Sequence, residues 1–211
     1  MEVKIKVCGM KDATNVADLA ALGPDYMGFI FYKKSPRDVS NLITFETIDS
    51  LPENIEPVAV VVDMPLHEMV DLEELGFSTI QLHGQESPEV CQTLIDHDFT
   101  VIKVFSVGEE FDFTQLEEYE HCVDYFLFDT KGKQPGGNGV QFDWGLLKEY
   151  NYDKPFFLSG GIGPDHIDAI KGFKHPQFYA IDVNSGFEIE PGLKNIEVLK
   201  QTVFNVKNQQ G

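Results

Sequence analysis

Short runs of β-branched and aromatic residues recur along the chain, and longer stretches with amphipathic patterning separate them. The short runs predict strands and the longer stretches predict helices, because side chains repeat every two residues in a strand and every 3.6 in a helix. The predicted strands are Val3–Gly9, Asp25–Phe31, Glu56–Asp63, Ser78–Gly84, Thr100–Val107, Asp124–Thr130, Lys154–Gly161 and Phe178–Gly186. The predicted helices lie in Ala13–Leu22, Leu66–Leu75, Pro88–Ile95 and His166–Ile170, with a poor helix or a loop at Gly108–Glu120.

This alternation of strand and helix predicts the α/β class and a single domain over residues 1–211, because no linker or low-complexity segment interrupts it. Eight strand–helix units favour a (β/α)8 TIM barrel close to the lower size limit of that fold. The alternative is an open, doubly wound sheet. We favour the barrel because no GxGxxG follows the first strand, where a dinucleotide-binding sheet would carry it.

Several predicted strands carry polar residues on the face that points into the barrel. Alternation in the first strand places Val3, Ile5 and Val7 toward the helices, so that Lys6 and Cys8 point inward. The same alternation in later strands turns these residues inward: Gln81, His83, Asp129 and Asp182. Active sites of such barrels lie at the C-terminal ends of the strands. Buried polar groups are costly unless they are used or satisfied, so we interpret the set as a site and not as a plug of paired core residues.

Two of these inward residues are candidates for proton transfer. Cys8 ends the first strand, and a free thiol with a pKa of about 8.5 is only slightly ionised at neutral pH. We expect Lys6, two residues earlier on the same face, to favour the thiolate. Asp129 ends the sixth strand and supplies a candidate acid across the barrel mouth. The other two cysteines, Cys91 and Cys122, are interpreted as structural.

An anion site is predicted where the last two strands end. In barrels, the turns after strands seven and eight often hold phosphate through backbone N–H groups. The candidate residues in these turns are Gly160, Gly161, Asn184, Ser185 and Gly186. Arg37 follows Ser35-Pro36 after the second strand, and its guanidinium has the planar fork that suits a carboxylate. The alternative role for Arg37 is a surface ion pair.

Composition excludes some partners. The net charge is −19, with 35 acidic and 16 basic side chains and no basic cluster, which argues against nucleic acid and against an anionic membrane surface. A small anionic ligand remains compatible if its site is locally basic. The three cysteines have neither CxxC nor zinc-ligand spacing, so we expect no metal and no disulfide framework. The longest apolar run, Val58–Val62, is too short to cross a bilayer and the N-terminus does not resemble a signal peptide, so we expect a cytoplasmic protein.

Motifs spread along the whole chain carry a family resemblance. In chain order they are Val7-Cys8-Gly9, Gly28–Phe31 with Ser35-Pro36-Arg37, Gln81–Gly84, Phe128-Asp129, Gly136–Gly139 with Phe142–Trp144, Ser159–Gly161, and Asp182–Gly186 with Pro191-Gly192. Together they resemble the phosphoribosylanthranilate isomerase family of tryptophan biosynthesis. The resemblance implies an Amadori rearrangement of N-(5-phosphoribosyl)anthranilate to 1-(2-carboxyphenylamino)-1-deoxyribulose 5-phosphate, without a cofactor. It implies one partner, a small anionic phosphosugar substrate, and a monomer or a homodimer.

The resemblance also assigns roles to residues. Cys8 is similar to the family's general base, Asp129 to its general acid, and Arg37 to its ligand for the anthranilate carboxylate. The two glycine-containing turns match its phosphate site, and the remaining substrate-binding candidates are Lys6, His83, Gln81 and Asp182. We expect the Gly136–Gly139 loop to fold over the site. Three residues depart from the family pattern without touching the proton-transfer pair: Asp63, Asn138 and Asn184.

Three alternatives remain open at this stage. A sugar isomerase of the histidine pathway has a related reaction, but it uses an aspartate at the end of the first strand where this chain has Cys8. A lyase or synthase would need a catalytic lysine on an inner strand, for which Lys6 and Lys103 are the candidates. The third is a phosphate-binding regulatory module without catalysis.

Overall fold

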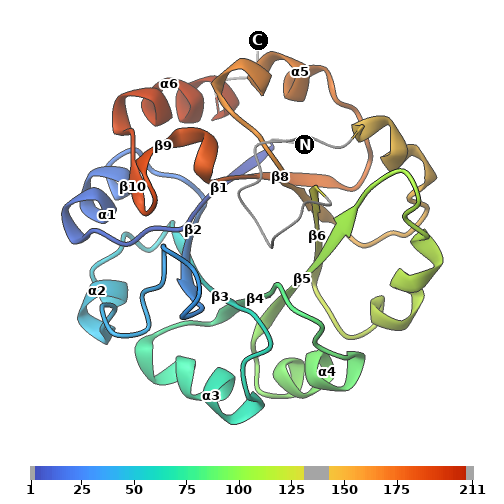
Figure 1. The fold of residues 1–211 in the computed structure, drawn as a ribbon, viewed down its shortest axis with the longest axis horizontal. Coiled ribbons are helices and arrows are strands. Elements are labelled where there is room, and N and C mark those ends of the chain that lie inside the picture. Colours follow the sequence, from blue (N-terminus) through green and yellow to red (C-terminus); the bar gives the residue numbers. More distant parts are fainter. Residues whose placement is uncertain (1–2, 131–142, 208–211) are drawn as a thin grey trace.

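A computed structural model describes residues 3–130 and 143–207. Eight parallel strands form a closed barrel in chain order, and β1 bonds to both β2 and β8 to close it (Figure 1). The strands are β1 Lys4–Cys8, β2 Tyr26–Phe31, β3 Glu56–Val61, β4 Thr79–Leu82, β5 Thr100–Val107, β6 Tyr125–Thr130, β7 Phe156–Leu158 and β8 Phe178–Val183. The predicted barrel is confirmed, and the open doubly wound sheet is wrong.

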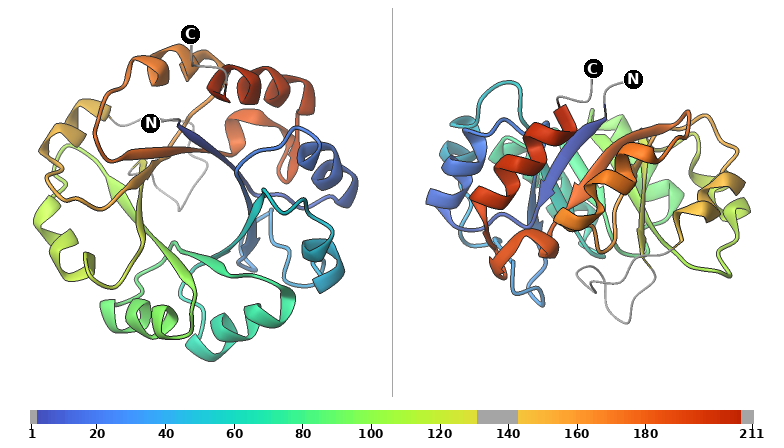
Figure 2. Two further views of the ribbon diagram at one scale, coloured as in Figure 1. Left: turned by 180° about the vertical axis from the view of Figure 1, so that it is seen from behind. Right: turned by 90° about the horizontal axis from the view of Figure 1, so that it is seen from above.

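Helices surround the barrel on its outer side, as the views from behind and from above show (Figure 2). The α-helices are α1 Ala13–Ala20, α2 Phe45–Asp49, α3 Leu66–Val70, α4 Pro88–Asp96, α5 Ile167–Gly172 and α6 Ile196–Lys207. Short 3₁₀ helices are η1 Asp71–Leu75, η2 Phe113–Tyr119, η3 Trp144–Glu149, η4 Pro164–His166 and η5 Ser185–Phe187. The poor helix expected at Gly108–Glu120 is the 3₁₀ helix η2. The described residues contain no helix long and apolar enough to span a bilayer.

The predicted strands have the correct number and positions, but several end earlier than predicted. The seventh is the clearest case, because Lys154–Gly161 contains only the three strand residues Phe156–Leu158. Gly160 and Gly161 have φ angles of 92° and 66°, in the left-handed region that a β-strand does not use. The strand therefore stops at Leu158, and the two glycines that follow turn the backbone along the cavity.

Two apolar layers hold the fold together. Outward-facing strand residues such as Ile5 and Val7 pack with the helices in one large cluster. A smaller cluster fills the barrel itself and includes Val58, Val60 and Ile102. The lower part of the interior is packed with aromatic rings from four strands: Tyr26, Tyr125, Phe157 and Tyr179. The interior is therefore a filled core, and open space remains only above it, at the C-terminal ends of the strands.

Side chains of the barrel strands point alternately into the barrel and toward the helices, as the sequence pattern predicted. Cys8 belongs to the interior cluster, whereas its neighbour Val7 belongs to the outer one. In β5, Ile102 and Val104 point inward. Lys103 therefore points toward the helix layer, where its Nζ is buried and lies 2.9 Å from Glu86 Oε2. Lys103 is thus not on the inner face, which removes one of the two lysines that a lyase would use.

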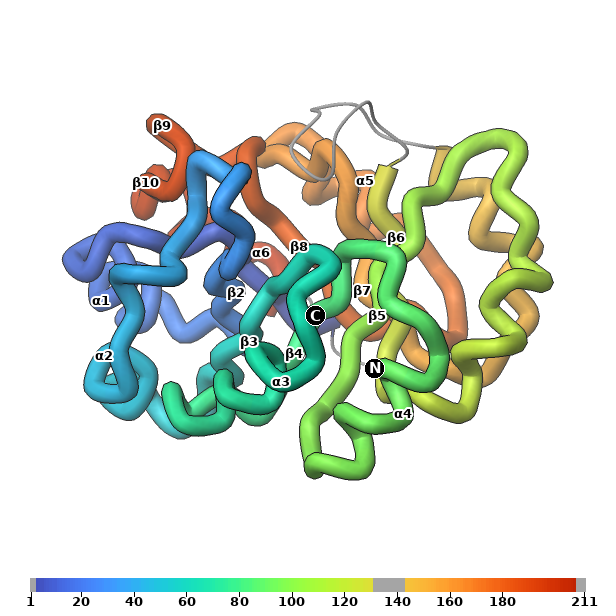
Figure 3. Tube along the Cα trace, turned by 60° about the horizontal axis from the view of Figure 1, so that its bottom comes forward, coloured from blue at the N-terminus to red at the C-terminus, as the bar shows by residue number. Residues whose placement is uncertain are grey.

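A small hairpin follows β8 that the sequence pattern did not predict. Its strands are β9 Glu188–Glu190 and β10 Leu193–Lys194, which pair antiparallel outside the barrel. The hairpin and the loop after β2 rise side by side at the same end of the barrel (Figure 3), and a hydrogen-bonded contact between Arg37 and Glu188 joins them. The contact therefore joins the loop after β2, which carries Arg37, to the hairpin after β8, which carries Glu188.

Candidate active site

A cavity of about 480 Å³ opens at the C-terminal ends of the strands. It gathers almost every candidate that the sequence singled out. Those lining it are Cys8, Arg37, Gln81, His83, Asp129, Gly160, Gly161, Asp182, Asn184, Ser185 and Gly186. Lys6 does not line it. The structure therefore brings together both proton-transfer candidates, the candidate carboxylate ligand Arg37 and the two glycine-containing turns.

Cys8 lies on the cavity floor next to a buried ion pair. Lys6 Nζ is fully buried and lies 2.8 Å from Asp182 Oδ1. Burial raises the pKa of Cys8 above its ordinary value of 9.0, and the positive charges of Lys6 and Lys194 oppose this rise without cancelling it. Lys6 therefore favours the thiolate, as expected, but burial outweighs it. We reassign Lys6 from binding substrate to supporting Cys8 and Asp182, because its ammonium is enclosed by protein.

The position of Cys8 depends on a glycine in the next strand. A Cβ at Gly28 would lie 2.8 Å from Cys8 Sγ, which is closer than real Cβ atoms come to a heavy atom. Gly28 is paired with Cys8 in the barrel register. The absence of a side chain at this position leaves room for the thiol at the end of β1.

Asp129 occupies the end of β6, and His83 faces it from the end of β4. Thr130 N donates to Asp129 Oδ1 at 2.8 Å, which fixes one carboxyl oxygen. The other, Oδ2, lies 3.6 Å from His83 Nε2, too far for a hydrogen bond. His83 Nε2 and Gln81 Oε1 are buried and find no hydrogen-bond partner among the described residues. Buried polar atoms normally have a hydrogen-bond partner, so these two atoms are candidates for hydrogen bonds to a ligand.

The two turns at the proposed phosphate site require their glycines. A Cβ at Gly160 would lie 2.1 Å from Thr130 Oγ1, and one at Gly186 would lie 2.5 Å from Ile162 O. Gly160 also has a left-handed φ. The 3₁₀ helix η5 begins one residue after β8, with Asn184 as its N-cap and Ser185 and Gly186 as its first residues. This matches the arrangement in which barrels bind phosphate through loop amides and a short extra helix.

Arg37 is engaged in an ion pair that the sequence did not predict. Its Nε donates to Glu188 Oε1 at 2.8 Å and its Nη2 to Glu188 Oε2 at 2.5 Å. This hydrogen bonding with Glu188 raises the pKa of Arg37. The expected alternative, an ion pair, is therefore present, but it is partly buried and lies at the cavity wall, so it does not exclude a role for Arg37 in binding.

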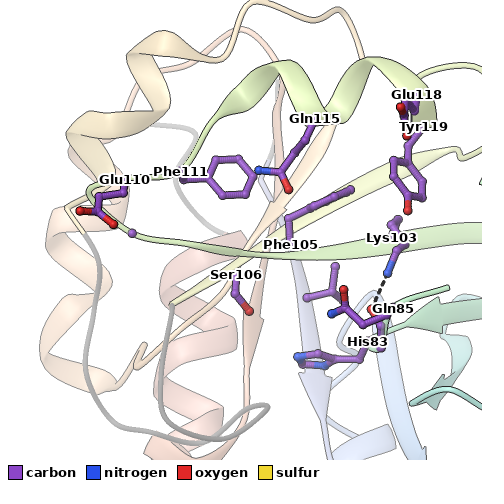
Figure 4. A pocket seen from close by; sticks show the side chains of 13 residues that line it. His83, Gln85, Lys103, Phe105, Ser106, Glu110, Phe111, Gln115, Glu118 and Tyr119 are labelled. Carbon is purple, nitrogen blue, oxygen red and sulfur yellow. Dashed lines mark hydrogen bonds between the residues drawn. The ribbon is translucent and has the colours of Figure 1, made fainter. Parts of the chain in front are cut away.

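Figure 4 shows a second cavity, of about 470 Å³. His83 lines both cavities. The second contains Phe105, Phe111 and Gln115, and it contains neither Cys8 nor Asp129. Lys103 at its edge donates to Gly84 O at 2.8 Å. The candidate chemistry therefore lies in the first cavity alone.

Within residues 3–130 and 143–207, no group of three or more His, Cys, Asp or Glu side chains is arranged to hold a metal ion. The predicted loop Gly136–Gly139 lies outside the described residues.

Sequence reasoning missed several residues of the site. Ile30, Val60 and Val62 give the cavity an apolar wall, and Tyr32 and Lys34 extend it along the loop after β2. Glu188 and Lys194 do not line the cavity, but they bind Arg37 and Asn184, which do. The alternation within β3 could have predicted that Val60 points into the barrel and belongs to this wall. No local pattern marked Glu188 or Lys194.

Comparisons with known proteins agree along nearly the whole chain. The family model described as N-(5'phosphoribosyl)anthranilate (PRA) isomerase matches residues 5–205. An N-(5'-phosphoribosyl)anthranilate isomerase from Parabacteroides distasonis is 45% identical over 204 residues, covering 96% of this chain and 92% of the relative.

Solved structures show the same agreement. Phosphoribosyl anthranilate isomerase from Thermotoga maritima is 31% identical with a TM-score of 0.87, covering 97% of this chain and 98% of that one. A structure of phosphoribosyl anthranilate isomerase in complex with reduced 1-(o-carboxyphenylamino)-1-deoxyribulose 5-phosphate is 29% identical, with a TM-score of 0.83 and the same coverage of 97% and 98%.

Proposed function

The chain belongs to the N-(5'-phosphoribosyl)anthranilate isomerase family, and we propose that Cys8 is the general base and Asp129 the general acid of its reaction. The protein is an isomerase of tryptophan biosynthesis that acts on a phosphosugar. The observation that carries the assignment of roles is that both groups, Arg37 and the two glycine turns line one cavity. A histidine-pathway isomerase and a regulatory module without catalysis are disfavoured by the family match.

The cavity offers a separate place for each part of the substrate. We assign the phosphate to the turns at Gly160-Gly161 and Asn184–Gly186, where backbone N–H groups bind an anion without a lysine. We assign the anthranilate carboxylate to Arg37 and the aromatic ring to the apolar wall of Ile30, Val60 and Val62. A relative's complex contains a reduced 1-(o-carboxyphenylamino)-1-deoxyribulose 5-phosphate, and this supports a substrate that presents an aryl carboxylate and a sugar phosphate to the cavity.

The first half of the reaction opens the sugar ring. Asp129, as acid, protonates the ring oxygen, and the bond from that oxygen to C1′ breaks. The lone pair of the anthranilate nitrogen forms a double bond to C1′, so the product of this step is an iminium ion. Because the substrate's own nitrogen supplies the electrons, the step needs no electron sink from a cofactor. Asp129 is left as a carboxylate, which Thr130 N stabilises through Oδ1.

The second half moves a proton from carbon. The iminium makes the C2′ hydrogen acidic, and Cys8 as thiolate removes it to give an enolamine. The enolamine then gains a proton at C1′ while its 2′-hydroxyl loses one, which gives the ketone. The enzyme is restored when the Cys8 thiol has lost a proton and Asp129 has regained one, so the rearrangement has no net proton change. The raised pKa of Cys8 makes its thiolate scarce but strongly basic.

The two unpartnered atoms at the C-terminal end of β4, on Gln81 and His83, suit the hydroxyl groups of the sugar. Gln81 Oε1 accepts and His83 Nε2 donates or accepts, depending on its tautomer. We propose that they bind the sugar hydroxyls, and that Asp182 orients the same part of the substrate from the opposite wall. Lys6 serves this group indirectly through its ion pair with Asp182.

Incubation with N-(5-phosphoribosyl)anthranilate, followed by the change in anthranilate-type fluorescence, tests the proposal. The wild type should turn over and should keep its activity after dialysis against EDTA. Borohydride should trap no adduct, because Lys6 and Lys103 are both buried in ion pairs. Activity that requires a divalent ion, or a trapped lysine, would contradict the acid–base mechanism.

A further inference from the structure

Three charged side chains, Arg37, Glu188 and Lys194, form a cluster at the edge of the cavity. Glu188 of β9 accepts two hydrogen bonds from Arg37, and its Oε1 lies 2.6 Å from Lys194 Nζ of β10. Gly192 N also donates to Glu188 Oε1, at 3.0 Å. Lys194 Nζ in turn donates to Asn184 Oδ1 at 2.7 Å. One carboxylate is thus bonded to Arg37 directly and to Asn184 through a single lysine.

The cluster is enclosed and charged. The side chain of Glu188 is 5% exposed, that of Lys194 is fully buried, and that of Arg37 is 14% exposed. Burial acts to raise the pKa of Glu188, but the bonds from Arg37 and Lys194 outweigh it and lower the pKa to about 2. Burial lowers the pKa of Lys194, and the Glu188 carboxylate opposes that shift. The cluster thus places two basic side chains around one carboxylate. This local excess of basic side chains lies beside an anion site on a protein whose net charge is −19.

Glu188 leaves part of Arg37 available. A guanidinium carries five N–H groups, and Glu188 uses the Nε–H and one on Nη2. The edge formed by Nη1 and the second Nη2 hydrogen keeps the spacing that a carboxylate accepts. A guanidinium held on one edge by a buried carboxylate has lost most of its rotational freedom before the substrate arrives. Arg37 is therefore preorganised, so less conformational entropy is lost when the substrate binds.

Arg37 and Asn184 also converge on one point of the backbone. A Cβ at Gly9 would lie 2.7 Å from Arg37 Cδ and 2.8 Å from Asn184 Oδ1. Gly9 directly follows Cys8, and its φ of 78° turns the chain at this point. The carboxylate ligand and the phosphate turn are therefore packed against the residue that follows the base.

We propose that Glu188 is a positioning residue that fixes the spacing between the carboxylate ligand Arg37 and the phosphate turn at Asn184, acting on the latter through Lys194. This inference rests on the proposed function of these two groups. The substrate carries its carboxylate and its phosphate at opposite ends, so its reacting carbons reach Cys8 and Asp129 only if both anion sites are at the correct separation. Misplacement by about 1 Å costs on the order of a hundredfold in rate.

The test compares Glu188→Gln with Glu190→Gln, which removes the same charge from the same hairpin at an exposed position outside the cluster. Steady-state kinetics are measured, together with inhibition by anthranilate and by inorganic phosphate as separate probes of the two sites. We expect Glu188→Gln to lower kcat/KM by about tenfold to a hundredfold, because misplaced reacting carbons lower kcat and weakened anion sites raise KM, and to weaken both inhibitors. Glu190→Gln should behave as the wild type.

A double-mutant comparison separates positioning from general loosening. Arg37→Met should weaken anthranilate inhibition, and adding Glu188→Gln should weaken it little further, because Glu188 acts on that site through Arg37. A merely structural role would give additive losses. If Glu188→Gln fails to fold, Glu188→Asp, which keeps the charge and withdraws the oxygens by one methylene, carries the same expectation.

The two failures are distinguishable. If Arg37→Met leaves anthranilate inhibition unchanged, the proposed carboxylate site itself is wrong. If Arg37→Met weakens it while Glu188→Gln leaves both inhibitors and KM at wild-type values, the carboxylate site stands and the positioning role of Glu188 is overturned.

Discussion

Replacing Arg37 by Met tests how much the proposed contact between Arg37 and the anthranilate carboxylate contributes to kcat/KM. The change removes the guanidinium edge that faces the substrate and keeps a side chain of similar length. Hydrogen bonds to charged groups contribute about 1.5–3 kcal/mol, which corresponds to a loss of about ten- to a hundredfold in kcat/KM. The assay is turnover of N-(5-phosphoribosyl)anthranilate and of an analogue that lacks the carboxylate.

The expected signature is non-additive. The analogue should react poorly with the wild type, and Arg37→Met should cost it little more, because the contact that the mutation removes is already absent. Lys33→Met is the matched control: it removes one positive charge from the same loop at an exposed residue outside the cavity. Equal losses for substrate and analogue would refute the contact. A loss that fades with added salt would show long-range attraction instead.

Three further outcomes are expected. Asp129→Asn should lower kcat by at least about a hundredfold, because the amide still accepts from Thr130 N but cannot donate the ring-opening proton; near-normal turnover would remove Asp129 as the acid. Inactivation of the wild type by iodoacetamide should become faster as pH rises from 7 toward 9, because the pKa of Cys8 is raised above 9.0 and only the thiolate is alkylated; an inactivation rate that is flat over this range would contradict a raised pKa. Glu188 has a folded pKa of about 2 against an ordinary 4.5, so about 3 kcal/mol of stability, present above pH 4.5, should be lost as pH falls to 2. Urea unfolding at a series of pH values should show this slope for the wild type and not for Glu188→Gln.

The sequence pattern predicted the barrel because period-two runs are local. Eight such runs were visible without any knowledge of tertiary contacts, and their parity correctly turned Cys8, Gln81 and Asp182 inward. The alternation of residues predicts which face of a strand a side chain occupies, but not how deep in the barrel it lies. Lys6 shares its face with Cys8, yet it is enclosed by protein and paired with Asp182, so it does not line the cavity.

The cluster at Arg37 could not be predicted from the sequence. Glu188 lies 151 residues from Arg37, so no local motif joins them. The hairpin that carries Glu188 has strands of only three and two residues, too short for a periodic signal. The ends of the barrel strands were predicted too long for a related reason, since left-handed glycines such as Gly160 and Gly161 are set by the turn they make.

The central claim is that the thiol at the end of β1 takes the proton from C2′. Turnover of Cys8→Ser, followed by fluorescence, tests it most directly, with Cys122→Ser as the control because that thiol lies away from the cavity. The account predicts that Cys8→Ser loses at least about a hundredfold in kcat with little change in KM, while Cys122→Ser keeps wild-type turnover. A Cys8→Ser enzyme that turns over at a rate close to the wild type would contradict the account.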